Sequence, residues 1–246
     1  MNAISIKGLS VSYDQKRVLT NIYMEIESGH IYGVIGPNGA GKSTLFKAIL
    51  DLAESDSGKI EVEGNSIKNK RKTVVYVPQK NDLDWTFPTT VYDVVLMGRY
   101  PHKGIFQQLN KADHKMAIQA LEEVDIVHLK DRQIGELSGG QQQRVFIARA
   151  LCQEAEILLL DEPFVGVDIT TEEKIISILK RLAEEGKTIL VVHHDLSSVA
   201  EYFDKVILLN QRLIAYGDTL ITFTEENVAK TYQSQLPILH KMTTLT

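Results

Sequence analysis

The sequence predicts an α/β fold: a parallel-sheet core that carries an antiparallel β subdomain and an inserted α-helical subdomain. The first observation is an apolar run, Ile31–Ile35, which is typical of a buried parallel strand and leads directly into a glycine-rich loop. The second is strand–helix–strand order near the end of the chain, from Glu156–Leu160 through the helix Thr171–Glu184 to Thr188–Val192. The third is helical spacing of apolar residues between these two parts of the chain.

The first 35 residues alternate between apolar and polar positions, with turn signals at Asp14-Gln15-Lys16 and Ser28-Gly29. The apolar positions are Ile4, Ile6, Leu9, Val11, Ile22, Met24 and Ile26. We expect antiparallel strands here, and a helix from about Lys42 to Leu50 after the glycine loop. A second antiparallel patch is expected at Lys59–Glu63 and Thr73–Val77.

Helical spacing begins at about Asp82 and continues to Gln153, where Met116, Ala120, Leu121 and Val124 define one apolar face. We therefore predict a single domain over 1–246, with a core at 1–81 and 154–217 and a helical subdomain at 82–153. The remaining tail, 218–246, contains a possible short helix at Glu225–Tyr232 and receives no function.

Composition limits the classes of function. The chain has 246 residues, 43% hydrophobic and 24% charged, and its net charge of -5 argues against a nucleic-acid binder. Cys152 is the one cysteine, so no internal disulfide can form and a reducing compartment is expected. Its setting on a helix face favours a structural thiol over a reactive one. No signal peptide or membrane span is visible, so we expect a cytosolic protein unless a partner holds it at a membrane.

The glycine-rich loop has the phosphate-loop pattern of two glycines followed by Lys-Ser, which predicts a P-loop NTPase (RecA-like) core. Its glycines let backbone N–H groups converge on phosphate oxygens, and the following helix presents its positive end to the same anion. Lys42 would reach the β- and γ-phosphates of a bound nucleotide, and the Ser43 hydroxyl would ligate magnesium. The loop residues are Gly36, Pro37, Asn38, Gly39, Ala40, Gly41, Lys42, Ser43 and Thr44.

A second element is the apolar strand Ile157–Leu160, which ends in Asp161-Glu162-Pro163. Asp161 would lie at the carboxyl edge of the sheet, where it can hold the magnesium shell. Glu162 could then polarise the attacking water as general base. The phosphate loop alone would leave kinases, GTPases and many ATPases open, and the Asp161-Glu162 pair counts against a kinase or GTPase.

The third element is Leu137-Ser138-Gly139-Gly140-Gln141, which precedes the helical stretch Gln142–Leu151. Ser138 is a suitable helix N-cap, and the glycines expose backbone N–H groups at a second helix N-terminus. With this stretch the sequence resembles the ATP-binding subunits of ABC transporters, from Tyr13 to about Gly217. A flexible Ser-Gly-Gly hinge is the alternative interpretation of the stretch by itself.

The resemblance implies an ATP hydrolase that works with Mg²⁺ as a head-to-tail homodimer enclosing two ATP molecules. Each γ-phosphate would touch Lys42 of one chain and Ser138 and Gly140 of the other, within a signature stretch of Ser138, Gly139, Gly140 and Gln141.

The resemblance assigns further residues one by one. Tyr13, with Val18 behind it, would stack on adenine, although a core tyrosine is the alternative. Gln79 would reach magnesium and the water, and Asp168 would lie in a dimer-contacting loop. His194 would contact the γ-phosphate as a switch residue, while the neighbouring His193 is interpreted as structural.

Separate integral membrane permease subunits are implied, with an extracytoplasmic metal-binding protein as an indirect partner. The chain would then be cytoplasmic and peripheral on the inner face of the cell membrane. Trp85 and Phe87 lie in a polar loop with a proline, where docking onto a permease is favoured over packing between the two lobes.

The segment around Trp85 and the run Val192–Leu196 look most like the ATPases of bacterial manganese and related divalent-metal importers. A zinc or iron/iron-chelate importer is the alternative, as is a soluble ABC ATPase without membrane partners. His102, Asp113 and His114 are interpreted as solvated positions and not as a metal site.

Overall fold

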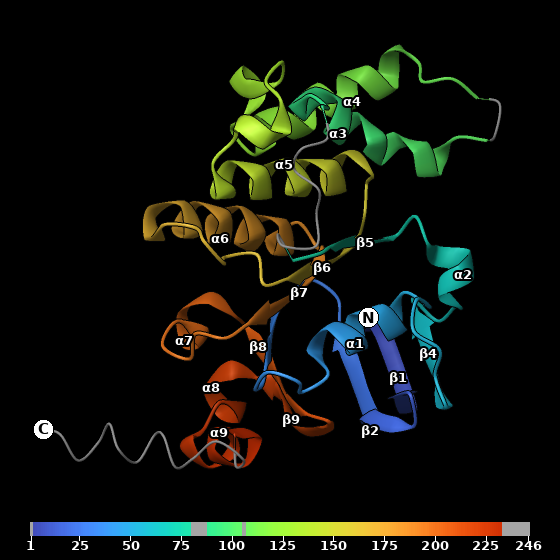
Figure 1. Cartoon of the computed structure of the whole chain (residues 1–246), viewed down its shortest axis with the longest axis vertical. Helices are drawn as coiled ribbons and strands as arrows, with labels where there is room; N and C mark the ends of the chain where they lie inside the picture. The colour runs from blue at the N-terminus through green and yellow to red at the C-terminus, as the bar shows by residue number, and fades with distance from the viewer. Residues whose placement is uncertain (1, 80–87, 105–106, 233–246) are drawn as a thin grey trace, which may run out of the picture. The chain divides into compact units, whose positions relative to one another are not determined.

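The structure, a computed structural model, describes residues 2–79, 88–104 and 107–232 (Figure 1). It consists of two compact units, the first made of Met1–Ile67 and Val191–Thr246 and the second of Lys68–Leu190. The strand β7 (Thr188–His193) and the short helix α2 (Ile67–Lys70) cross the division between them.

The first unit begins with an antiparallel sheet in the order β2-β1-β4. β1 (Asn2–Tyr13) and β2 (Lys16–Glu27) form a hairpin whose turn residues Asp14 and Gln15 both have positive φ. β4 (Ser57–Val62) pairs with β1 on its other side. The predicted apolar positions of β1 and β2, from Ile4 to Ile26, are all buried, so the period-2 pattern placed them correctly.

The same unit holds the strand that leads into the glycine loop. β3 (Ile31–Ile35) is buried along its whole length and pairs in parallel with β8 (Lys205–Asn210), which pairs antiparallel with β9 (Arg212–Asp218). The helices are α1 (Lys42–Ile49), α7 (Val199–Tyr202), α8 (Thr219–Thr222) and α9 (Glu225–Tyr232). The last of these is the helix predicted in the tail.

The second unit corrects one expectation about the strands. β5 (Val74–Val77) pairs in parallel with β6 (Ile157–Asp161), whereas we expected the segment Thr73–Val77 to belong to an antiparallel patch. The reason is that Val74, Val75 and Val77 are all buried, which is the continuous apolar pattern of a parallel strand and not an alternating one.

The rest of the second unit is helical. Its helices are α3 (Val91–Leu96), η2 (Met97–His102), α4 (Lys111–Glu123), η3 (Val127–Leu129), η4 (Ile134–Glu136), α5 (Gly139–Cys152) and α6 (Ile169–Glu184). α3, α4 and α5 pack against one another, and α5 also contacts α6 (Figure 1). Of the predicted apolar face, Ala120 and Leu121 of α4 and its C-cap Val124 are buried, and Met116 is half-buried.

Parallel strand pairs, antiparallel strands and packed helices together confirm the predicted α/β class. The subdomain boundaries at 81/82, 153/154 and 217/218 stay a prediction.

Candidate functional site

The glycine loop and helix α1 form a compact turn in the first unit. Gly41 is the N-cap of α1 in the left-handed region at φ 95°, and no side chain caps the helix there. A Cβ at Gly41 would lie 2.6 Å from Leu19 Cδ2, and one at Gly36 would lie 2.0 Å from the carbonyl oxygen of Leu209. Glycine is therefore required at both positions, by conformation and the nearby Leu19 side chain at Gly41 and by close approach of the Leu209 backbone at Gly36.

Lys42 folds back over this loop. Its side chain is 7% exposed, and its Nζ donates hydrogen bonds to the carbonyl oxygens of Gly36 at 2.8 Å and Pro37 at 3.0 Å. The ammonium group is thus held at the N-terminus of α1, where both its charge and the helix dipole attract an anion. Next to it, Ser43 is exposed, as are Asn38 and Gly39 in the loop.

Tyr13 lies at the end of β1, opposite Lys16, with its side chain 45% exposed. Val18 is half-buried on β2. An aromatic ring at this exposure is not a core residue, so the alternative of a buried strand tyrosine is wrong. The ring is accessible to a stacking partner such as a nucleotide base.

In the second unit, the predicted carboxylates follow β6. Asp161 ends the strand, is 5% exposed and accepts a hydrogen bond from the Tyr76 hydroxyl at 3.1 Å. Glu162 follows with φ 50°, an uncommon left-handed conformation for a residue with a side chain. Its Oε2 accepts a 2.8 Å hydrogen bond from Gln79 Nε2, so the structure joins two of the predicted catalytic side chains.

Sequence reasoning missed Tyr76. In the structure Tyr76 is the half-buried residue of an otherwise buried strand, and this strand pairs with β6, which carries Asp161. A tyrosine in that position usually finds a partner for its hydroxyl.

The signature stretch also forms a helix N-terminus, as predicted. Ser138 is the N-cap of α5 and completes a capping box with Gln141. The Ser138 N–H donates to Gln141 Oε1 at 3.0 Å, and the Gln141 N–H donates to Ser138 Oγ at 3.4 Å. The amides of Gly139 and Gly140 take no part in the box.

Asp168 is the N-cap of α6. Its carboxylate accepts from the Thr171 N–H at 3.0 Å and from the Thr171 hydroxyl at 2.7 Å. These hydrogen bonds lower the pKa of the Asp168 carboxyl. Because the side chain of Asp168 is exposed, the charge is presented to solvent at the start of the helix.

The two adjacent histidines have different environments. His193 ends β7, is 3% exposed, contacts the Phe203 ring and shares a 2.8 Å hydrogen bond with Ser198 Oγ. Burial lowers the pKa of His193 to about 4, so the ring is neutral at physiological pH. His194 is exposed. The structure places His193 in the core, in agreement with its structural interpretation, and His194 on the surface.

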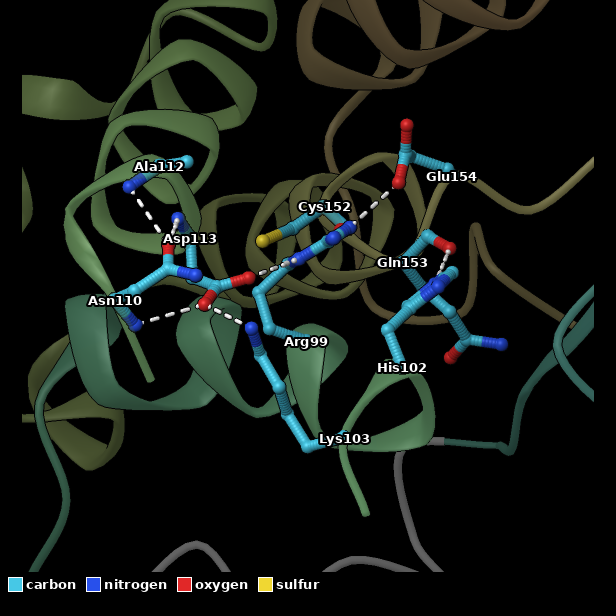
Figure 2. Close-up of polar contacts among 9 residues, drawn as sticks. All are labelled: Arg99, His102, Lys103, Asn110, Ala112, Asp113, Cys152, Gln153 and Glu154. Atoms are coloured by element: carbon cyan, nitrogen blue, oxygen red, sulfur yellow. Dashed lines mark hydrogen bonds and ion pairs between the residues drawn. The ribbon is translucent and has the colours of Figure 1, made fainter. Parts of the chain in front are cut away.

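A buried charged cluster in the second unit was not foreseen. Arg99 and Asp113, 7% and 3% exposed, pair through Arg99 Nε and Asp113 Oδ1 at 3.1 Å, and Lys103 also pairs with Asp113 (Figure 2). Arg99 Nη1 donates to the Cys152 carbonyl and to Glu154, each at 2.8 Å.

The interpretation of Asp113 as a solvated position is therefore wrong, because three cationic or capping neighbours compensate its burial. It completes the Asn110 capping box of α4 while it pairs with Arg99 and Lys103. His114 instead meets Tyr92 at 2.5 Å, and His102 meets the Gln153 carbonyl at 2.8 Å. Within residues 2–79, 88–104 and 107–232, no three His, Cys, Asp or Glu side chains are grouped as a metal site.

Cys152 ends α5 beside this cluster, 1% exposed, and burial raises the pKa of its thiol to about 11. The prediction of a structural thiol is consistent with both values. Trp85 and Phe87, predicted to dock a partner, lie outside the described residues. In the described part of the chain no helix is both long and apolar enough to cross a membrane.

Comparison with known proteins gives consistent relatives. The family profile described as ABC transporter matches residues 19–165. The chain is 51% identical to the manganese transport system ATP-binding protein of Halalkalibacterium halodurans, over 97% of this chain and 95% of that protein. It is also 51% identical to the zinc transport system ATP-binding protein of Treponema pallidum, over 95% and 88%.

Among solved structures, a metal-chelate-type ABC transporter in an inward-facing conformation superimposes with a TM-score of 0.84 at 32% identity. That likeness covers 94% of this chain and 89% of the other.

Proposed function

The chain belongs to the ABC transporter family, it hydrolyses ATP, and we propose that it powers the import of a divalent metal ion, most specifically manganese. Manganese is favoured because the chain is about half identical, over almost its full length, to manganese transport ATP-binding proteins from several bacteria. Zinc is the second candidate, because the relative from Treponema pallidum is equally similar.

The phosphates are proposed to bind at the N-terminus of α1, with Lys42 on the β- and γ-phosphates. Lys42 is already held there by the Gly36 and Pro37 carbonyls, so the charge needs little reorganisation to meet its ligand. Tyr13, supported by Val18, would stack on the adenine, since its ring is the exposed aromatic group at the end of β1.

The donor set fits magnesium, because the Ser43 hydroxyl, the Asp161 carboxylate and the Gln79 amide oxygen are all hard oxygen ligands. These three residues would hold the ion, and when bound it would neutralise charge that develops on the phosphates. The Gln79–Glu162 hydrogen bond supports this assignment, since an amide that donates its N–H₂ group to Glu162 keeps its oxygen available for a cation.

Glu162 would accept a proton from the attacking water as general base. Its left-handed backbone is the uncommon conformation expected where function fixes a side chain, and Gln79 orients its carboxylate. His194, exposed beyond β7, would contact the γ-phosphate.

Two copies are proposed to act together, head to tail. Ser138 and Gly140 of one copy would cover the γ-phosphate held by Lys42 of the other, and Asp168 would contact the partner copy. The signature end of α5 supports this arrangement because it is a second helix N-terminus, where an anion could bind in addition to the one at α1.

Integral membrane permease subunits would carry the metal and hold this chain at the inner face of the membrane, with an extracytoplasmic metal-binding protein feeding them. Trp85 and Phe87 are proposed as the docking pair. The ATPase itself would not touch the transported ion.

The test is metal accumulation in cells that carry a deletion of this gene, complemented by wild type or by Glu162→Gln. Manganese uptake restored by wild type alone supports the proposal, and zinc uptake restored in its place selects the second candidate. Co-purification of a multispan membrane protein with the tagged chain tests the permease separately. ATPase activity that responds only to DNA or ribosomes would instead indicate a soluble member of the family.

A further inference from the structure

Two segments of the proposed dimer surface meet inside one chain, at the start of α6. The signature stretch opens α5, and the loop ending in Asp168 opens α6, and these two helices are in contact (Figure 1). The residue between them is Thr171, in the first turn of α6 and only half-buried. Its backbone N–H and its hydroxyl contact Asp168, and its methyl group faces Gly140.

The hydroxyl of Thr171 faces Asp168. It donates to Asp168 Oδ2 at 2.7 Å, while the Thr171 N–H donates to Oδ1 at 3.0 Å, so both carboxylate oxygens are held. The backbone bond is sufficient to cap the helix. The hydrogen bond from the Thr171 hydroxyl is not needed for capping. It is a second constraint, and it fixes the orientation of the Asp168 carboxylate.

The methyl group of Thr171 faces Gly140. A Cβ at Gly140 would lie 2.1 Å from Thr171 Cγ2 and 3.3 Å from Val167 Cγ1. The α5 backbone at the signature stretch therefore packs directly on the threonine methyl, with no side chain between them. At this separation neither helix end can shift toward the other without moving it.

We infer that Thr171 is a positioning residue for ATP hydrolysis: its hydroxyl orients Asp168 and its methyl supports Gly140, so both segments reach the partner copy in a fixed relation. The inference rests on the proposed function, in which Asp168 and the signature stretch both face the second copy. A movement of one segment as the dimer closes would then be transmitted to the other segment through the Thr171 side chain.

Two substitutions separate the contact of the Thr171 hydroxyl with Asp168 (the hydroxyl arm) from the contact of its methyl group with Gly140 (the methyl arm). Thr171→Val keeps the methyl and the backbone N–H but removes the hydroxyl, whereas Thr171→Ser keeps the hydroxyl and removes the methyl. Thr170→Val is the matched control, because Thr170 is the exposed neighbour on the same helix turn. We expect Thr171→Val to lower kcat about tenfold with an unchanged KM for ATP, the pattern of an interaction used only during turnover. Thr170→Val should leave both constants at the wild-type values.

A cycle with Asp168→Ala tests whether the hydroxyl acts through Asp168. If it does, Thr171→Val has no further effect on kcat once Asp168 is removed, while Thr171→Ser still lowers it. A wild-type kcat for Thr171→Val, or full additivity with Asp168→Ala, overturns the hydroxyl arm.

The methyl arm is measured by thermal unfolding, independently of any dimer. Gly140→Ala should lower the unfolding midpoint because its Cβ collides with Cγ2, and Thr171→Ser should restore part of the loss by removing that atom. Strictly additive losses overturn the arm. ATP-dependent dimerisation of Glu162→Gln is measured alongside. If that fails while the unfolding cycle shows rescue, the proposed dimer is wrong and the packing link stands.

Discussion

Among the described helices, α1 and α5 both have glycine at their N-termini, and these two ends satisfy their polar groups in different ways. At α1 the N-cap is Gly41, no side chain caps the helix, and the lysine that follows is held over the loop. At α5 the N-cap is Ser138, and a complete capping box with Gln141 closes the end. The α1 end can therefore take up a ligand in the isolated chain, whereas the α5 end is stable without a ligand.

This difference indicates which helix end should bind an anion first. An uncapped helix end with a fixed ammonium group gains most from an anion, so α1 should bind nucleotide in the isolated chain. The α5 end gains less, because its own side chains already serve two amides. We expect it to contribute only after a second copy brings a phosphate to Ser138 and Gly140.

The largest effect is expected when both ends are left intact and the chemistry is removed. Glu162→Gln should keep nucleotide binding but lower turnover about a thousandfold, since an amide cannot accept the proton of the water. Both helix ends then stay occupied, and a stable ATP-bound dimer should elute on size-exclusion chromatography. Turnover near the wild-type rate would remove Glu162 from the role of base.

Lys42→Ala breaks the α1 end alone. We expect turnover to fall by at least about a hundredfold, because the charge that meets the phosphates is lost from a preorganised position. Nucleotide affinity of the single chain should fall as well, measured with a fluorescent ATP analogue. Lys47→Ala, an exposed lysine on the same helix, is the control and should retain both properties.

The histidine pair repeats the contrast between a group satisfied internally and one turned outward. The pKa of His193 is lowered from 6.5 to about 4, so unfolding takes up a proton in this range and the stabilisation present above pH 6.5 is lost as pH falls toward 4. The loss should reach about 3 kcal/mol at the acid limit. Denaturant unfolding of His193→Asn should show a flatter pH dependence than that of the wild-type protein. Equal slopes for wild type and His193→Asn would contradict the assignment.

Ser138→Ala breaks the α5 end and should have the smallest effect. Loss of the cap costs about 1 kcal/mol of stability, and turnover should fall about tenfold through the lost hydrogen bond to phosphate. Nucleotide affinity of the isolated chain should not change, in contrast to Lys42→Ala. Ser138→Asn keeps a capping oxygen and should recover the stability, which thermal unfolding can check.

The features predicted correctly from the sequence are those with local causes. The helix that follows the glycine loop, the N-cap at Ser138 and the helix Glu225–Tyr232 each depend on residues within a few positions of one another. The strands β1 and β2 could be predicted equally well, because the alternation of apolar and polar residues shows which side chains face inward.

The features that were missed depend on partners distant in the sequence. Asp113 was taken as solvated because nothing near it indicates burial, and its environment depends on Arg99, which is itself fixed by the Cys152 carbonyl 53 positions further on. Likewise, Val74–Val77 does not show whether its neighbour is parallel, since that depends on β6. Tyr76 was missed for the same reason, as its hydroxyl partner Asp161 ends that distant strand.

The buried thiol at the end of α5 has a practical consequence. Because Cys152 is the sole cysteine, is 1% exposed and has its pKa raised to about 11, it should react with maleimides far more slowly than an exposed thiol. A cysteine introduced at exposed Thr170 could then carry a spin label or fluorophore without first altering the native residue. The distance between two such labels would report directly on how two copies approach each other as ATP is added.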